Sequence, residues 1–418
     1  MKNLFLITSH YPYGKGESFL SDELKVAESH FDTITIISLS KAPDEIKRFI
    51  PSNCTVVNTR KKRIIIKHFL KSLLTFLNIQ TIREFFYSQT KYKDNFIISL
   101  KKLFISNYII SILSSCFKNL QIDYKNAVFY SYWLSSSAAF LVRLKQQHPE
   151  STYISRAHGG DCFFERGYQV YRREIISGLD AIYSISEAGR KDILNHFGSY
   201  IKSGNAIRVN RLGILKTATA VNPYESQKNN MINIVSCSNV IQLKRLDMII
   251  DTLSVVDFCK ISWVHFGDGD FMEKIQNYAR DKLSNKANIH YEFKGFVLNN
   301  EILNYYGTNP IDLFINTSDV EGIPYSIMEA FSFDIPAIAR NVGGNAEIID
   351  DYRNGFLLDK NVSCLEIAKR LKEYQEWNND RKITMRLNAL TTYEYKYDAE
   401  KNYNIFFQDI VNLKTNYA

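Results

Sequence analysis

Short apolar runs alternate with longer amphipathic segments along most of the chain. Runs of about four to eight residues that are rich in β-branched and aromatic side chains predict buried strands. We assign such strands to Asn3 to Thr8, Thr33 to Ser38, Ala127 to Trp133, Tyr153 to Ala157, Ala181 to Ser186 and Ala206 to Asn210, and then to Ile232 to Ser236, Ile261 to Phe266, Ile289 to Phe293, Ile311 to Asn316 and Ile335 to Ala339. Helical patterns separate most of these runs. A repeated order of strand, helix and strand predicts an α/β protein with parallel sheets.

The polar stretch from Lys216 to Asn230 divides this series. It contains Pro223 and shows no hydrophobic periodicity, so we predict that it is a linker. A chain of 418 residues also exceeds the size that a single core usually supports. We therefore expect two domains, residues 1–215 and 216–390, followed by a final helical segment at 391–418.

Composition favours a soluble globular protein, with 45% hydrophobic and 23% charged residues. The six cysteines are scattered and lack paired spacing, which predicts neither a disulfide framework nor a zinc site and is typical of a reducing cytoplasm. The apolar run from Leu4 to Ile7 is too short for a secretory signal. We also expect no segment apolar enough, over about 20 residues, to cross a membrane.

Positive charge is concentrated in one segment of the first half. Between Arg60 and Lys102 the sequence has eleven basic residues and two acidic ones, so this segment accounts for the whole net charge of +8. Apolar residues recur there at helical spacing, among them Ile66, Phe69, Leu70, Leu73, Leu74, Leu77, Phe96, Ile97 and Leu100. Basic amphipathic helices with aromatic anchors suit an anionic membrane surface, and we predict such docking through residues 60–118. The alternative is that the apolar faces pack on the first sheet and the lysines are only solvated. No accompanying motif favours nucleic-acid binding.

The most informative stretch runs from Glu321 to Ile349. Glu321 and Glu329 lie eight positions apart, and Gly322, Ile323 and Pro324 between them predict a loop that turns into a helix. Strands are expected on both sides, so the carboxylates should lie at the C-terminal edge of a parallel sheet, where such sheets bind ligands. The free N–H groups at the start of the helix can bind a phosphate or a sugar oxygen. An ordinary amphipathic helix with two surface glutamates is the simpler alternative.

This stretch resembles the donor-binding motif of the retaining glycosyltransferases of family 4, which have the two-domain GT-B fold. That motif has a glutamate, seven residues and a second glutamate, followed by a strand and a Gly-Gly turn with a further glutamate. Glu321, Glu329, Gly343, Gly344 and Glu347 match it. The resemblance implies two Rossmann-like domains facing a central cleft, with the C-terminal helix crossing back onto the N-terminal domain.

Two segments of the first half also match that family, more loosely. A loop with Gly14, Gly16 and Glu17 resembles its acceptor-side loop, although a plain connection is the alternative. The residues Arg156, His158 and Asp161 match a pattern in which the histidine touches the transferred sugar. The resemblance assigns a catalytic role to His158 and places Arg156 and Asp161 on the acceptor or sugar side. A lone histidine is otherwise usually structural.

The start of the second half resembles the family's diphosphate clamp, which uses an arginine and a lysine five residues apart. Lys244 matches the lysine, whereas Asn239 stands at the arginine position. Arg245 follows the lysine and is our candidate for supplying the missing charge. An exposed basic pair without function is the alternative. By the same resemblance, Phe296 and Val297 would lie along the nucleobase.

The resemblance implies transfer of a sugar from a UDP- or GDP-linked donor to a glycan or lipid-linked acceptor of the bacterial cell envelope, with retention at the anomeric carbon. Glu321 would bind sugar hydroxyls and Glu329 the ribose, and Lys244 with the helix N-terminus would stabilise the leaving diphosphate. No metal or other cofactor is expected. We expect a cytoplasmic protein, peripheral at the inner face of the plasma membrane. The alternatives are a nucleotide-sugar epimerase or phosphorylase of the same fold, and a non-catalytic membrane-associated scaffold.

Overall fold

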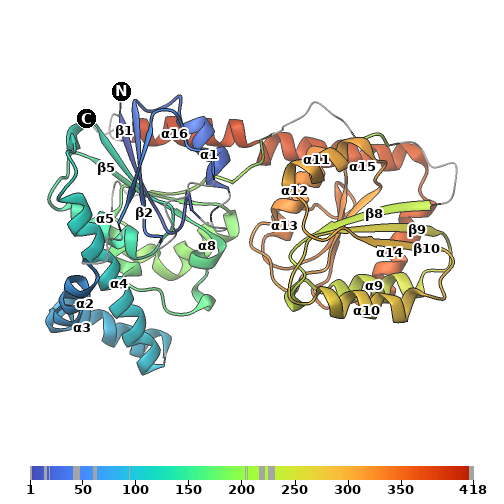
Figure 1. The fold of residues 1–418 in the computed structure, drawn as a ribbon, viewed down its shortest axis with the longest axis horizontal. Helices are drawn as coiled ribbons and strands as arrows, with labels where there is room; N and C mark the ends of the chain where they lie inside the picture. Colours follow the sequence, from blue (N-terminus) through green and yellow to red (C-terminus); the bar gives the residue numbers. More distant parts are fainter. Residues whose placement is uncertain are drawn as a thin grey trace. The chain divides into compact units, whose positions relative to one another are not determined.

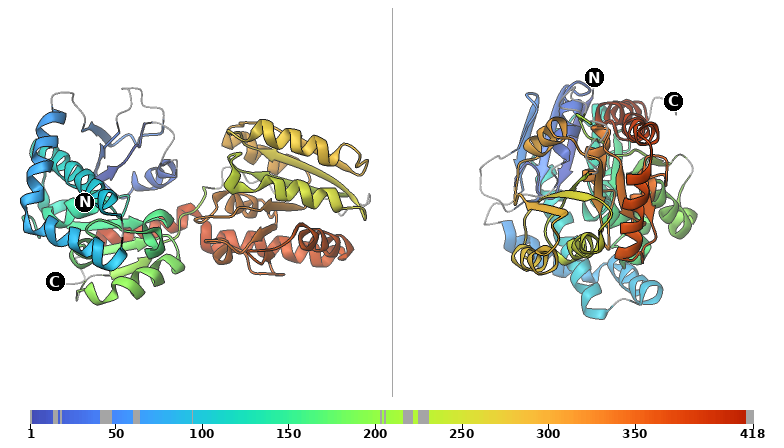
Figure 2. Two further views of the ribbon diagram at one scale, coloured as in Figure 1. Left: turned by 90° about the horizontal axis from the view of Figure 1, so that it is seen from below. Right: turned by 90° about the vertical axis from the view of Figure 1, so that its right-hand side faces the viewer.

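The computed structural model describes residues 2–13, 17, 19–40, 48–59, 64–93, 95–202, 204, 206–215, 222–224 and 231–413 (Figures 1 and 2). The chain forms two compact units. Unit 1 comprises Met1–Leu212 and Glu400–Ala418, and unit 2 comprises Gly213–Ala399. Gly14, Gly16 and most of the expected linker lie outside the described residues.

Unit 1 is built on a parallel seven-stranded sheet with the order β3-β2-β1-β4-β5-β6-β7. Its strands are β1 (Asn3–Thr8), β2 (Thr33–Ser38), β3 (Cys54–Asn58), β4 (Ala127–Ser131), β5 (Thr152–Ala157), β6 (Ala181–Ser184) and β7 (Ala206–Val209). Its helices are α1 (Leu20–Ala27), α2 (Ile64–Leu74), α3 (Ile79–Tyr87), α4 (Phe96–Phe117), α5 (Ser136–Lys145), α6 (Gly159–Cys162), α7 (Arg172–Gly178), α8 (Glu187–Phe197) and α16 (Ala399–Asn412). Strand β3 was not predicted from the sequence, because its residues are only partly buried at the edge of the sheet.

Unit 2 contains a parallel six-stranded sheet with the order β10-β9-β8-β11-β12-β13. Its strands are β8 (Met231–Cys237), β9 (Lys260–Phe266), β10 (Ile289–Phe293), β11 (Leu313–Asn316), β12 (Ala337–Arg340) and β13 (Gly355–Leu358). Its helices are α9 (Leu246–Val255), α10 (Met272–Leu283), α11 (Asn299–Thr308), α12 (Tyr325–Ser332), α13 (Asn345–Ile348), α14 (Cys364–Glu376) and α15 (Asn379–Thr392). Neighbouring strand residues such as Ile234 and Val235 belong to two separate apolar clusters, one on each face of the sheet.

Both sheets have the Rossmann-type order 3-2-1-4-5-6, and unit 1 adds a seventh strand. The predicted class of two Rossmann-like α/β domains is therefore confirmed. In each sheet the strand order reverses between the first and fourth strands, at β1 and β4 in unit 1 and at β8 and β11 in unit 2. The carboxyl ends of such a strand pair are where open α/β sheets bind ligands.

The chain returns to unit 1 at its last helix. Phe406 of α16 packs edge-on against Tyr183, and the Tyr183 hydroxyl donates to Asp409 Oδ2 at 2.6 Å. Residues 391–399, which we expected to belong to this returning segment, instead lie in unit 2. The reason is that Tyr393 and Tyr397 are buried in its core.

The connection between β3 and β4 carries three helices, α2 to α4, which we call the helical insertion (residues 64–117). Its inner side is fixed to unit 1 through Glu84, which accepts hydrogen bonds from the Tyr171 amide at 2.9 Å and from Arg173 Nη2 at 3.0 Å. The insertion also exposes thirteen of the 27 large exposed apolar side chains in the described part of the chain: Ile66, Phe69, Leu70, Leu73, Leu74, Leu77, Ile79, Ile82, Phe86, Phe96, Ile97, Ile98 and Ile105. The insertion is therefore anchored to unit 1 and at the same time rich in exposed apolar side chains.

Helix α4 corrects one sequence-based expectation. With 22 residues it is long and apolar enough to cross a membrane by length and composition, whereas we expected no such segment. Core helices of soluble proteins meet the same criterion. Leu103, Ile110 and Leu113 of α4 pack in the core of unit 1, and polar Ser106 and Asn107 are buried with them.

Candidate functional site

At the strand-order reversal of unit 2, the loops after β8 and β11 bring Lys244 and Glu321 together. The Lys244 ammonium lies 2.7 Å from Glu321 Oε1, and Asn316 Nδ2 donates to the same oxygen at 3.0 Å. The Lys244 and Glu321 side chains are 22% and 9% exposed. A cation and a carboxylate predicted from separate motifs thus form one partly desolvated pair.

Glycines set the shape of the Glu321 loop. Gly343 has φ +53°, and a Cβ there would lie 1.9 Å from the Glu321 carbonyl oxygen. The Gly344 amide donates to the Gly322 carbonyl at 2.6 Å. The loop before α12 therefore packs directly on a Gly-Gly backbone that side chains would push away. A Cβ on Gly322 would meet nothing within 4 Å, so that side of the loop is open.

Helix α12 begins at Tyr325, with Pro324 at the N-cap position rather than inside the first turn. Ile323 packs against the core of unit 2. Glu329 lies on this helix and accepts a hydrogen bond from Asn299 Nδ2 at 2.7 Å. Burial and, to a smaller extent, the Glu329 charge raise the pKa of the Cys237 thiol to about 12, which locates this carboxylate near the end of β8.

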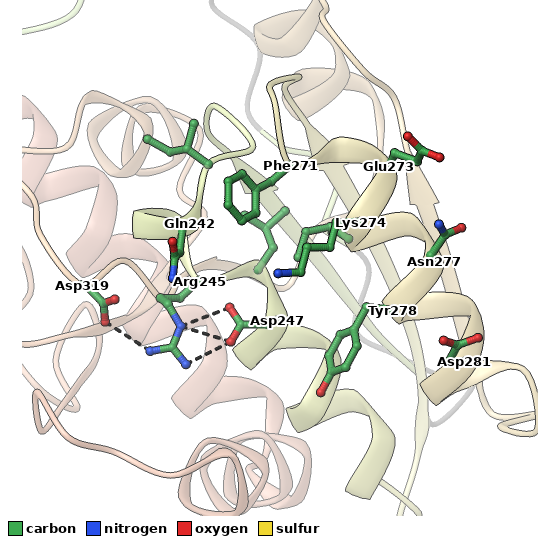
Figure 3. Close-up of a pocket in the computed structure, with 13 residues that line it drawn as sticks. Gln242, Arg245, Asp247, Phe271, Glu273, Lys274, Asn277, Tyr278, Asp281 and Asp319 are labelled. Carbon is green, nitrogen blue, oxygen red and sulfur yellow. Dashed lines mark hydrogen bonds and ion pairs between the residues drawn. The ribbon is translucent and has the colours of Figure 1, made fainter.

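Arg245 does not join Lys244, contrary to our expectation that it supplies the charge missing at Asn239. Its backbone is left-handed (φ +52°), and its guanidinium bonds Asp247 at 3.0 to 3.1 Å and Asp319 at 3.4 Å (Figure 3). It lines a different cavity from the one that Lys244 lines. The turn at Arg245 is the physical reason, since it directs two consecutive side chains apart. Asn239 is exposed.

The loops after β8, β9 and β10 stack on one another. A Cβ on Gly267 would lie 1.8 Å from the Ser238 carbonyl oxygen, and the Gly267 amide donates to Gly295 O at 2.8 Å. After this contact, Phe296 is 77% exposed and Val297 packs partly into the core. An aromatic ring is thus left open to solvent at the edge of the sheet.

In unit 1, Glu17 organises the loop after β1. Its carboxylate accepts N–H bonds from Ser9, His10 and Tyr11 at 2.7 to 2.8 Å, and Trp133 Nε1 donates to it at 2.6 Å. These bonds tie the loop after β1 to the residues after β4. Glu17 is 7% exposed, so it holds the loop in shape from within.

His158 follows β5, the strand next to β4 and therefore next to the strand-order reversal of unit 1. Its ring centroid lies 4.6 Å from those of both Tyr132 and Trp133, and its buried Nε2 has no hydrogen-bond partner among the described residues. Burial, helped by the charge of Arg156, lowers the pKa of His158 to about 3. The imidazole is therefore neutral at physiological pH, with one nitrogen left for a ligand.

Asp161 holds the His158 backbone in place. Its carboxylate accepts hydrogen bonds from the His158 amide and, at 2.7 Å, from the Leu134 amide. Burial raises the pKa of Asp161 to about 6, although the charge of buried Arg172 opposes this. Asp161 thus joins the ends of β4 and β5, and its role is to position His158.

Arg156 is fully buried, and its donors are engaged inside unit 1. It bonds Glu23 at 3.2 Å, the Tyr130 hydroxyl at 2.8 Å and Asn210 at 3.0 to 3.1 Å. Its guanidinium also lies 4.4 Å from the ring of Phe406. The expectation that it faces an acceptor is not supported, because this network instead anchors α16. Sequence reasoning missed its partners, which are far apart in the chain.

Among the described residues, no three His, Cys, Asp or Glu side chains gather in a way that could hold a metal ion. The polar groups that the structure does bring together are the Lys244–Glu321 pair in unit 2 and the Glu17–Trp133 and Asp161–His158 contacts in unit 1.

Comparisons with known proteins agree with this geometry. Residues 223–386 match the family model described as glycosyl transferases group 1. The O-antigen biosynthesis glycosyltransferase WbnH of Escherichia coli is 24% identical over 274 residues, which cover 64% of this chain and 74% of that protein. An uncharacterized glycosyltransferase of Methanocaldococcus jannaschii is 30% identical over 119 residues, 28% of this chain and 31% of that protein.

Solved structures show the same fold along the whole chain. The apo lipopolysaccharide outer core galactosyltransferase WaaB has a TM-score of 0.67 at 16% identity and covers 100% of both chains. Anabaena HepE in complex with UDP has a TM-score of 0.67 at 15% identity and covers 98% of this chain and 99% of that one. The two units together therefore have the GT-B fold.

Proposed function

We propose that this chain transfers a hexose from a nucleoside diphosphate sugar to a glycan or lipid-linked acceptor in polysaccharide biosynthesis, with retention at the anomeric carbon. The match of residues 223–386 to the model of the group 1 glycosyl transferases supports this class of reaction. The single observation that carries the proposal is the Lys244–Glu321 pair at the strand-order reversal of unit 2. Solved relatives of this fold contain UDP, which favours a uridine donor over a guanosine one.

The chemistry requires positive charge at the departing diphosphate. Lys244 supplies an ammonium at the edge of the sheet, and the first N–H groups of α12 add a positive dipole end beside it. Both can act without a metal ion. In the structure the ammonium is bound by Glu321, so a diphosphate would compete with this carboxylate and leave it free for sugar hydroxyls.

Glu321 and Glu329 divide the donor between them in this proposal. Glu321 binds hydroxyls of the sugar and Glu329 the ribose, since carboxylates pair well with the two O–H groups of a diol. Phe296 and Val297 are placed beside the base. His158 contributes a neutral imidazole, which can hydrogen-bond the transferred sugar without adding charge to it.

Retention requires the acceptor to attack from the side of the leaving group. Because no carboxylate is assigned as a covalent nucleophile, the leaving phosphate oxygen would take the proton of the acceptor hydroxyl. Exclusion of water is then essential, since hydrolysis competes with transfer.

The acceptor side includes a membrane in our proposal. The helical insertion combines thirteen exposed apolar side chains with exposed basic residues, namely Lys67, Lys71, Arg83, Lys91, Lys93 and Lys101. Apolar groups that enter the lipid interface and cations that pair with anionic headgroups are the two elements of peripheral membrane binding. We place the protein at the cytoplasmic face of the plasma membrane, where anionic lipid and nucleotide sugars meet.

Thermal unfolding with a panel of nucleotides and nucleotide sugars tests the donor site. A ligand present at 100 times its Kd stabilises the folded state by about 2.7 kcal/mol. We expect stabilisation by one base's diphosphate, most strongly UDP, in the wild type and its loss in Glu329→Ala. An unchanged melting temperature with every compound, in the presence of anionic vesicles, would contradict the proposal.

A further inference from the structure

A cavity of about 800 Å³ opens on unit 2 between the start of α9 and helix α10 (Figure 3). None of Lys244, Glu321 and Glu329 lines it. It lies next to them, because Arg245 follows Lys244 and Asp319 lies two residues before Glu321, but their side chains do not line it. The cavity is thus a separate feature from the candidate donor site.

The charges in this cavity are largely compensated. The Arg245 guanidinium is held between Asp247 and Asp319, which line the cavity with it. Asp319 is also bound at 2.6 Å by Arg340. The remaining charged groups of the lining are Lys274 on one side and Glu273 and Asp281 farther out along α10 (Figure 3). Four carboxylates against two cations disfavour a polyanion such as a nucleotide diphosphate.

The same groups are well suited to hydroxyls. A carboxylate such as Asp247 accepts from O–H groups, and the Gln242 amide and the Lys274 ammonium donate to oxygen. Gln242, Lys274 and Asn277 are all solvent-exposed, so their polar groups are accessible to a ligand that enters the cavity. Several donors and acceptors within one small area can bind adjacent hydroxyls in pairs.

Two aromatic rings complete the lining. Phe271 lies at the start of α10, with the Lys274 ammonium 5.3 Å from its ring centroid. Tyr278 lies one turn beyond Lys274, and its hydroxyl donates to Asp251 Oδ1 at 2.7 Å, which fixes the ring. Rigid ring faces beside polar groups can pack against the C–H face of a sugar while the hydroxyls are bound at the rim.

We propose that this cavity is a second glycan-binding site, which takes an uncharged stretch of oligosaccharide apart from the donor. This proposal rests on the proposed function in one respect: the glycan would be the acceptor or the product of the glycosyl transfer. The cavity volume accommodates a few sugar units, as for other ligand pockets of 300 to 1,000 Å³. Such a site would hold the chain end of a polymer near the enzyme between transfers.

The test measures binding of neutral tri- to pentasaccharides to the full-length protein by ligand-observed NMR, without nucleotide. We expect saturable binding with a Kd below about 10 mM. Tyr278→Leu removes the ring and Lys274→Ala removes a surface donor, and each should weaken binding roughly five- to tenfold. Using two variants covers the possibility that the less exposed Tyr278 affects folding, since Lys274 is exposed and has no ion pair among the described residues.

Lys244→Ala is the matched control. It should leave oligosaccharide binding unchanged while it abolishes stabilisation by nucleotide, so that failure of the donor site and failure of the glycan site are told apart. The proposal is overturned if no neutral oligosaccharide binds saturably, if binding is equal in the wild type and both cavity variants, or if acidic oligosaccharides bind more tightly than neutral ones of the same length.

Discussion

Unit 1 and unit 2 share one strand order but fill the connection between their third and fourth strands differently. In unit 2, the single helix α11 links β10 to β11. In unit 1, the insertion links β3 to β4 and exposes thirteen large apolar side chains. The shared strand order fixes where the ligand-binding loops lie, whereas the connection between the third and fourth strands can carry a separate interaction surface.

The two strand-order reversals also differ in polarity. In unit 2, Lys244 and Glu321 are charged and partly open to solvent. In unit 1, the corresponding loops after β1 and β4 carry the Glu17 carboxylate, which is only 7% exposed and is bonded by Trp133. His158, after the neighbouring strand β5, packs against Tyr132 and Trp133, and burial keeps it neutral by lowering its pKa to about 3. Under the proposed function, unit 2 would bind the charged diphosphate, and His158 of unit 1 would bind the uncharged sugar.

The largest expected effect comes from removing the cation of unit 2. Lys244→Ala should lower kcat/KM by roughly 100- to 1,000-fold, the usual cost of losing one group that stabilises charge in the transition state. Lys260→Ala, at an exposed position of β9, is the control and should behave like the wild type. If kcat/KM of Lys244→Ala stays within tenfold of the wild-type value, the proposed difference between the strand-order reversals of unit 1 and unit 2 is wrong.

The apolar insertion should give the next largest effect. Leu77→Glu, Phe86→Glu and Ile97→Glu together place three charges on side chains that are 80%, 61% and 73% exposed. We expect binding to vesicles with anionic lipid to fall roughly 100-fold or more, because each charge opposes insertion and repels the headgroups. Vesicle flotation at physiological salt measures this.

Unit 2 supplies the matched control for that experiment. Leu298→Glu, Leu365→Glu and Leu387→Glu change apolar residues of unit 2 that are 54%, 64% and 56% exposed. Their combination should leave vesicle binding unchanged. Equal loss in both triple variants would show that general charge, not the insertion, governs the interaction.

A smaller effect separates two glycines of the Glu321 loop. Gly343→Ala meets both a positive φ and the Glu321 carbonyl oxygen, and should lower the free energy of unfolding by about 1–3 kcal/mol. Gly322→Ala has open space and should fold normally while it weakens nucleotide binding. Denaturant unfolding and nucleotide titration of both variants measure these effects. Equal destabilisation by Gly343→Ala and Gly322→Ala would contradict the different surroundings of the two glycines.

The smallest effect concerns pH and unit 1. The unfolded state protonates His158 near pH 6.5, whereas the folded state does so only near pH 3, so unfolding takes up a proton between these values. The His158 contribution should therefore lower the free energy of unfolding by roughly 0.7 kcal/mol from pH 7 to pH 6. His158→Gln should show a correspondingly shallower pH dependence. Burial lowers the pKa of His265 to about 4, but His265 is present in both the wild type and His158→Gln. Its contribution therefore does not change the difference between their pH slopes. An identical slope in the two proteins would contradict a neutral His158.

Much of this arrangement could be predicted from the sequence because it is local. Strands with continuous apolar runs, the helix after Pro324 and the Gly343-Gly344 turn all depend on neighbours in the chain. The edge strand β3 was missed because its half-buried residues lack a clear apolar run. The length of α4 was missed because its polar and basic residues interrupt the run that the structure nevertheless forms into one helix.

Among the site residues, too, those in local motifs could be predicted, whereas contacts between distant parts of the chain could not. Lys244 and Glu321 were each indicated by a local motif, and the structure brings them into contact. The direction of Arg245 could not be predicted, since it depends on a left-handed turn and on Asp319, 74 residues away. The same holds for Arg156, whose partners Glu23 and Asn210 come from opposite ends of unit 1.

The return of α16 to unit 1 has a consequence for the order in which the protein can be completed. The ribosome releases all of unit 1 up to Leu212 first, then the whole of unit 2, and only then the helix that covers Arg156 and binds Tyr183. Until that moment the Arg156–Glu23 ion pair and the aromatic residues around it lack their cover. Although domains made first generally fold first during synthesis, here the unit that begins the chain is the last to be finished.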